Sequence, residues 1–210
     1  MEEYRYFVLN KPYNMVSQFV SSHKVRLLCH LKFDFPEGTH AIGRLDKDSE
    51  GLLLLTTDRR ITRLLFQSKT PHFRKYLIQV RGVVDQTIVQ QLRTGVSIPV
   101  SEGTEYVTKP CAVEMVDEPI GLFSNGKELH ERVPRSWLTI SLTEGKYHQV
   151  RKMVQAVGHP CKRLIRLSIE DIVLEDMQPG EIRELNKEDF YRRLRLGVDC
   201  KTVSENSNKK

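Results

Sequence analysis

One carboxylate in this 210-residue chain, that of Asp46, occupies a position typical of a catalytic residue. Asp46 lies between Gly43 and Gly51 in the segment GRLDKDSEG, and four leucines follow at residues 52–55. An apolar run bounded by turn residues is typical of a strand buried on both faces, and glycine permits a tight turn. The sequence therefore places Asp46 on a loop anchored to a rigid strand. An aspartate there either caps its own turn or is catalytic, and the rest of the chain must decide between the two.

The basic residues concentrate in two segments without any Asp or Glu. The net charge is +6, from 33 Lys and Arg against 27 Asp and Glu. Residues 59–81 hold seven basic residues and residues 145–166 hold six, so the rest of the chain carries 20 against 27. If these two acid-free segments face the same way, they make the electrostatic footprint of a protein that binds a phosphate backbone. The alternative is two ordinary solvated faces.

Composition argues against several other classes of protein. No apolar stretch reaches the roughly 20 residues that span a bilayer, and the charged, aromatic N-terminus does not read as a signal peptide. We therefore expect a cytoplasmic protein with no membrane partner. The four cysteines are widely scattered, without the close pair that marks zinc or redox sites. We expect no metal and no cofactor.

The order of elements predicts an α+β fold. Strands mostly follow strands instead of alternating with helices, which favours a mixed, largely antiparallel sheet flanked by short helices. We expect one domain over residues 1–198, a loop-like insertion near 117–135 and a disordered tail at 199–210. The predicted strands cover residues 4–9, 73–80, 105–116 and 136–142, and the predicted helices cover 58–67, 85–95, 147–157 and 187–194.

Four blocks of the sequence, in this order, resemble the pseudouridine synthases, in the branch that includes the RsuA enzyme. They are NKP with MVSQF at residues 10–19, the Asp46 turn, Lys75-Tyr76, and EGKYHQVRKM at 144–153. The resemblance covers roughly residues 5–196 and implies the pseudouridine synthase catalytic fold. It is strongest to the short RluE-like members, which act on large-subunit (23S) ribosomal RNA. We expect the chain, like them, to start directly at the catalytic domain, where most of the branch first carries a small RNA-binding module.

The resemblance implies an isomerase that converts a specific uridine of ribosomal RNA into pseudouridine. The reaction breaks the glycosidic bond, turns the uracil and rejoins it through carbon 5, with no redox change and no cofactor. Asp46 would be the nucleophile, attacking either the ribose or the uracil. Arg151 would keep Asp46 ionised in a water-poor pocket. Tyr76 would stack on the extruded base.

The remaining site residues implied by the resemblance contact the RNA. Arg44 would occupy the space that the extruded base leaves or hold a phosphate, and Leu164 would form an apolar wall of the pocket. For Tyr76 and Leu164 a plain core position is the alternative. His148 and His159 lack partners at ligand spacing, so we interpret both as RNA-facing or structural. The other expected RNA contacts are Lys75, Lys152, Arg163 and Arg166.

Two rival functions use the same features differently. A non-catalytic ribosomal RNA-binding or ribosome-assembly factor on the same fold has no physical reason to keep Asp46, Tyr76 and Arg151 together. An aspartate-dependent hydrolase for a small acidic substrate does not explain two acid-free segments. We therefore expect an enzyme that acts as a monomer on large-subunit ribosomal RNA.

Overall fold

The computed structural model describes residues 4–66, 71–101 and 103–196, so the tail expected at 199–210 lies outside the described residues. The strands are β1 (Tyr6–Lys11), β2 (His40–Ala41), β3 (Glu50–Thr56), β4 (Arg74–Arg81), β5 (Ser97–Ser101), β6 (Thr104–Val107), β7 (Ala112–Val116), β8 (Arg135–Leu142), β9 (Cys161–Ile169), β10 (Ile172–Val173) and β11 (Ile182–Leu185). The helices are α1 (Arg60–Phe66), α2 (Gln86–Thr94), α3 (Gln149–Ala156) and α4 (Lys187–Arg193), with a 3-10 turn at Leu28–His30.

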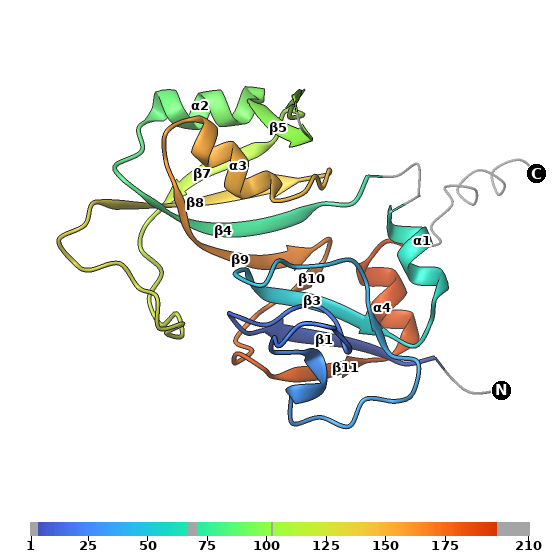
Figure 1. The fold of residues 1–210 in the computed structure, drawn as a ribbon. Coiled ribbons are helices and arrows are strands. Elements are labelled where there is room, and N and C mark those ends of the chain that lie inside the picture. The colour runs from blue at the N-terminus through green and yellow to red at the C-terminus, as the bar shows by residue number, and fades with distance from the viewer. Residues whose placement is uncertain (1–3, 67–70, 102, 197–210) are drawn as a thin grey trace, which may run out of the picture.

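A single nine-stranded sheet runs through the molecule in the order β11-β1-β3-β9-β4-β8-β7, with β2 added to β3 and β10 to β9. β3 and β9 pair in parallel, and the other described pairs are antiparallel. α2 and α3 lie against the β4-β8-β7 part of the sheet, whereas α1 and α4 lie at the β1-β3 end (Figure 1). The predicted α+β fold with a mixed, largely antiparallel sheet is confirmed.

The leucine run after Asp46 forms β3, and it is buried on both faces as predicted. Leu52 and Leu54 pack in the cluster on the α1 and α4 side of the sheet, and Leu53 and Leu55 pack in the cluster on the opposite side. All four side chains are fully buried. Burying one leucine contributes roughly 1.5–3 kcal/mol, so the strand that carries the Asp46 turn is a rigid support.

Helix ends lie where the capping residues predicted them. The side chain of Asp85 accepts a hydrogen bond from the Ile88 amide at the start of α2, and Asn186 accepts one from the Asp189 amide at the start of α4. Gly158, just past α3, has φ +83°, the left-handed conformation expected of a residue that ends a helix.

The predicted strand over residues 105–116 was wrong, because the chain forms two strands there. β6 pairs with β5 in a separate two-stranded sheet, whereas β7 pairs with β8 in the nine-stranded sheet. Between them, the Thr108 amide donates to the carbonyl of Val96 and the Cys111 amide to that of Arg93. Pro110 has no amide hydrogen to continue a ladder. Alternation of side chains persists through such a change of partner, so the sequence pattern does not reveal it.

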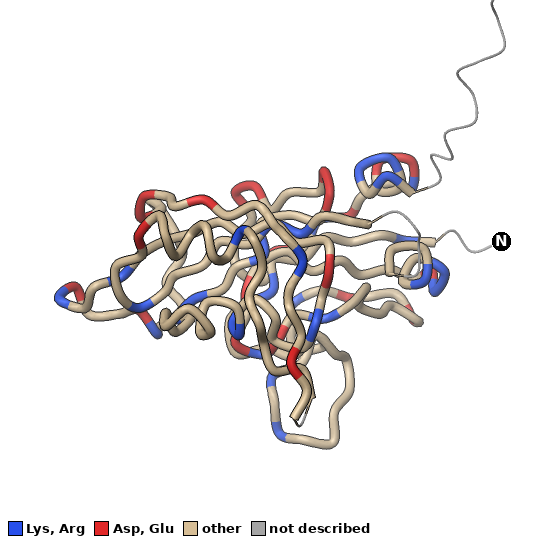
Figure 2. The backbone as a smooth tube through the Cα atoms, turned by 90° about the horizontal axis from the view of Figure 1, so that it is seen from above, with Lys and Arg blue, Asp and Glu red and all other residues tan. Residues whose placement is uncertain are grey.

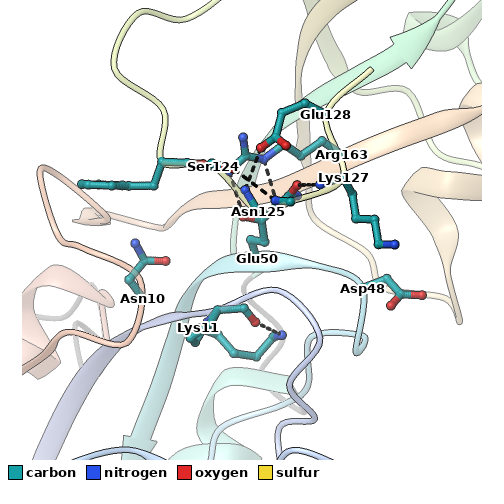
Figure 3. A network of polar contacts seen from close by, with 12 residues as sticks. Asn10, Lys11, Asp48, Glu50, Ser124, Asn125, Lys127, Glu128 and Arg163 are labelled. Carbon is teal, nitrogen blue, oxygen red and sulfur yellow. Dashed lines mark hydrogen bonds and ion pairs between the residues drawn. The ribbon is translucent and has the colours of Figure 1, made fainter. Parts of the chain in front are cut away.

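Residues 117–134 contain neither helix nor strand and are attached to the Asp46 turn through Glu50 (Figure 3). Nε and Nη2 of Arg163, on β9, donate to the two carboxylate oxygens of Glu50, each at 2.9 Å. Nδ2 of Asn125 donates to Glu50 Oε1 at 2.7 Å, and Arg163 Nη2 also donates to the Phe123 carbonyl at 2.6 Å. A bidentate arginine–carboxylate pair is a strong, directional contact. Glu50 is thereby tied to the loop and to β9 together.

We expect Arg163→Met to lower the free energy of unfolding by about 3–5 kcal/mol, measured by urea denaturation, because it leaves Glu50 buried without its cation. The matched control is Arg192→Met on α4, whose ion pair with Asp189 is exposed and should cost less than about 1 kcal/mol. Adding Glu50→Met to Arg163→Met should recover part of the loss, since both buried charges are then removed. Equal losses of unfolding free energy for Arg163→Met and Arg192→Met would contradict this account.

Gly51→Ala should destabilise the protein more than Gly121→Ala. Both glycines have positive φ, +97° and +78°, so each substitution strains the backbone. Only at Gly51 would the new Cβ meet another strand, 2.8 Å from the main-chain nitrogen of Arg166, whereas nothing lies within 4 Å at Gly121. Overpacking of this kind costs roughly 1–3 kcal/mol. Thermal unfolding of both variants measures the difference, and equal shifts would show that β9 does not press on Gly51.

Candidate active site

A cavity of about 1330 Å³ opens beside the Asp46 turn. Small-molecule pockets measure roughly 300–1,000 Å³, so this one suits a larger substrate. The structure brings both acid-free segments to it. From the first come Leu65, Phe66, Pro71, His72, Arg74 and Tyr76, and from the second come Gly145, Lys146, Tyr147, His148, Gln149, Val150, Arg151, Leu164 and Arg166.

Six of the nine predicted site residues line this cavity: Arg44, Asp46, Tyr76, Arg151, Leu164 and Arg166. Lys75 does not line it, because side chains alternate along β4 and Tyr76 takes the cavity side. Lys152 lies outside the lining, and its Nζ donates to the Pro99 carbonyl at 2.6 Å. Arg163 is buried in its pair with Glu50 and would have to leave that pair to reach a phosphate. We therefore now assign Arg163 a structural role.

The turn that presents Asp46 is closed by main-chain bonds. The Ser49 amide donates to the main-chain carbonyl of Asp46 at 3.0 Å. Ser17 fixes the preceding residue, since its hydroxyl accepts from the Leu45 amide and donates to the Leu45 carbonyl. The carboxylate of Asp46 is one-third exposed and lines the cavity. The turn is closed by the main-chain carbonyl of Asp46, so the turn itself does not use the carboxylate.

His148 is the basic side chain that the structure places against Asp46, with 3.3 Å between His148 Nε2 and Asp46 Oδ1. Sequence reasoning left His148 as RNA-facing or structural and missed this contact. The available signal was its place in the EGKYHQVRKM block, directly before α3. The imidazole therefore lies directly beside the carboxylate, at the edge of the cavity.

Arg151, on α3, is hydrogen-bonded to the turn that carries Asp46. Its Nη2 donates to the Asp48 carbonyl at 2.6 Å and to the Ser49 hydroxyl at 3.3 Å. The expected contact of Arg151 with the Asp46 carboxylate is thus replaced, in this structure, by bonds to the loop that carries Asp46. A planar guanidinium suits this task because its donors lie in a rigid fork.

Two buried cations lie close behind the site. Arg166 on β9 is 4% exposed, its Nε donates to the Leu52 carbonyl at 2.7 Å, and burial lowers its pKa although nearby Tyr76 raises it. Lys11 is fully buried, and its Nζ donates to the carbonyls of Pro12 and Met15. Burial lowers the pKa of Lys11 to about 7 against the opposing pull of Glu50 and other acids of the turn. Figure 3 shows Lys11 in the neighbourhood of Glu50. Lys11 thus holds the loop that follows β1, and Arg166 ties β9 to β3.

The cavity is basic even though the molecule as a whole is not uniformly so. Acidic and basic positions are interspersed over much of the chain (Figure 2). The cavity lining instead holds seven Lys and Arg against Asp46, Asp48 and Glu144, a surplus of four positive charges. The seven are Arg44, Lys47, Arg74, Lys109, Lys146, Arg151 and Arg166. Such a local surplus attracts a polyanion.

In the described part of the chain, no helix has the length and apolar character that crossing a membrane requires. In the same residues, no three His, Cys, Asp or Glu side chains gather in an arrangement that could hold a metal ion.

Comparison with known proteins agrees with the site. The family model described as RNA pseudouridylate synthase matches residues 5–156. The chain is 34% identical to ribosomal large subunit pseudouridine synthase E of Vibrio vulnificus (strain CMCP6), covering 89% of this chain and 77% of that protein. It is 37% identical to the protein of the same name from Xanthomonas axonopodis pv. citri (strain 306), covering 82% and 89%.

Solved structures give the same result. A crystal structure of a pseudouridylate synthase matches with a TM-score of 0.74 and 29% identity, covering 92% of this chain and 75% of that one. The family match spans the Asp46 turn, Tyr76 and Arg151, which are the residues gathered at the basic cavity. The chain therefore belongs to the RNA pseudouridylate synthase family, and it is an isomerase that acts on uridine in RNA.

Proposed function

We propose that this protein converts a specific uridine of large-subunit ribosomal RNA into pseudouridine, with Asp46 as the nucleophile. The observation that carries the proposal is the Asp46 carboxylate, presented on a rigid turn in a cavity that also contains Tyr76 and a surplus of positive charge. The names of the relatives from Vibrio and Xanthomonas support large-subunit ribosomal RNA as the target. We further propose that the protein acts as a cytoplasmic monomer and needs no cofactor.

Each side chain has a distinct task in this proposal. Asp46 forms a covalent bond to the substrate and so splits the isomerisation into two easier steps. Tyr76 offers its ring to the extruded uracil. Leu164, 4% exposed and paired with Ile78 across β4 and β9, supplies an apolar wall of the cavity. Arg44 is exposed on the rim, where its guanidinium is free to meet a phosphate or the gap left in the RNA.

Two features disfavour the rival functions. A pure RNA-binding factor benefits from the basic cavity, but a carboxylate at its centre would repel the phosphate backbone. A hydrolase of a small acidic substrate has no use for a cavity above the usual small-molecule size, lined from two distant basic segments. Measured activity distinguishes the three functions.

We expect Asp46→Asn to reduce pseudouridine formation by at least roughly 10³-fold, the order seen when a covalent nucleophile is removed, with little change in RNA affinity. Ribosomal RNA from cells that lack the protein serves as substrate, and chemical mapping of pseudouridine gives the readout. The matched control is Asp48→Asn, which removes the same charge from the same turn two residues away. Asp48 contacts Arg151 through its main-chain carbonyl, so this control should stay active. Normal modification by the Asp46→Asn protein would refute the assignment of the nucleophile.

RNA affinity should depend steeply on salt, because lysines and arginines that bind phosphates release counterions. In the Asp46→Asn background, Arg44→Ala should weaken RNA binding. It should also reduce the slope of log affinity against log salt concentration by about 1, the value for the loss of one phosphate contact. The control Arg60→Ala lies in an acid-free segment, but Arg60 pairs with Asp58 and does not line the cavity. It should leave the slope unchanged. Equal effects of the two variants in fluorescence anisotropy titrations would argue against a cavity-centred RNA surface.

A further inference from the structure

Tyr147 is a large aromatic side chain on the cavity rim that packing of the core does not use. It lines the cavity and is 71% exposed, in the turn directly before α3. Leaving most of an aromatic ring in water forgoes the burial that usually stabilises such residues. An exposed ring at the mouth of a basic cavity is therefore a candidate contact for a ligand.

Tyr147 and His148 form one stacked unit. Their ring centroids are 3.9 Å apart and the planes differ by 18°. Consecutive side chains normally point apart, by about 100° on a helix or to opposite faces of a strand. Here they stack because His148 takes a left-handed backbone conformation, with φ 54°. Non-glycine residues in that conformation cost energy and cluster at functional sites.

The stacked pair contacts Asp46 through His148 and a cation through Tyr147. Nε2 of His148 lies 3.3 Å from Asp46 Oδ1. Nζ of Lys152, on α3, lies over the Tyr147 ring, 5.4 Å from its centre, and donates to the Pro99 carbonyl. A base that stacks on the Tyr147 ring would take the place that the Lys152 ammonium now holds over the ring, and it would be separated from Asp46 by His148.

We propose that Tyr147 and His148 form a stacking platform for the base of the nucleotide next to the target uridine. The proposal rests on the proposed function, in which Tyr76 receives the target base itself. Extruding that base removes a stacking partner from its neighbours in the RNA, and an aromatic platform at the rim restores one. Stacking of a base on an aromatic side chain contributes roughly 1–3 kcal/mol and tolerates any base. The positive lining beside it, including Lys146 and Arg151, matches the adjoining phosphates.

The test compares two probes that share a backbone. The full chain carrying Asp46→Asn is titrated with a fluorescent oligouridylate and with an abasic ribose-phosphate oligomer of the same length. Tyr147→Ala should weaken binding of the oligouridylate by about 5- to 150-fold, the range that corresponds to roughly 1–3 kcal/mol. Binding of the abasic oligomer should not change. Tyr147→Trp should retain the affinity for the oligouridylate.

Tyr4→Ala is the matched control. Tyr4 is also exposed and also has a cation over its ring, the guanidinium of Arg60 at 4.8 Å, but it does not line the cavity. This variant should bind both probes like the parent protein.

Three outcomes would overturn the platform. Equal weakening for both probes would mean that Tyr147 supports phosphate contacts or the local fold. No weakening for either probe would mean that the ring meets something other than RNA, such as a protein partner or a second copy of the chain. Failure of Tyr147→Trp to bind would also exclude stacking. The titrations measure binding without turnover, so they test the platform whether or not the protein modifies ribosomal RNA. Failure of the proposed function would appear only in the modification assay.

Discussion

The close approach of β3 and β9 at Gly51 is the contact on which the site depends. The parallel register joins Glu50 to Ile165 and Gly51 to Arg166, and β4 pairs Tyr76 with the same Arg166. Gly51, Arg166 and Tyr76 therefore lie in register across three neighbouring strands. A side chain at position 51 would push β9 away from β3. This contact places the turn that carries Asp46 opposite the tyrosine, although the two are 30 residues apart in the chain.

The role of each arginine near the site depends on how deeply it is buried. Arg163 and Arg166 are buried, and their donors bond to Glu50 and to the Leu52 carbonyl, so they hold strands and turn in place. Arg151 bonds to the main chain of the Asp46 turn from α3. Arg44 is exposed on the rim and remains free for the substrate. Desolvating a cation is costly unless it is paired, and Arg163 meets this requirement through its ion pair with Glu50.

Asp46 lies between a rigid part of the sheet and side chains that can change position. Beneath it, the doubly buried β3 and the pair of Glu50 with Arg163 leave the turn little freedom. Above it, His148 and Tyr147 are partly or mostly exposed and belong to a turn, where a ligand can displace or cover them. The loop over residues 117–134 contacts the same turn through Asn125 and Glu50, so a segment without regular structure touches the site at its most ordered point. A rigidly held carboxylate with adaptable neighbours fits a reaction in which the base must detach, turn and rejoin.

The sequence by itself determined the fold class, the buried strand after Asp46, the helix caps, the family and six of the residues that line the cavity. These depend on local patterns: an apolar run, a capping side chain, or a block of motif residues. It failed where a partner distant in sequence decides the outcome. The break between β6 and β7 depends on bonds to Val96 and Arg93, and the burial of Arg163 depends on Glu50, 113 residues away. The contact of His148 with Asp46 arises only when α3 is packed beside the turn. Tertiary structure thus decided which basic side chains face the substrate and which hold the protein together, because burial and pairing are properties of the folded neighbourhood and not of residue type.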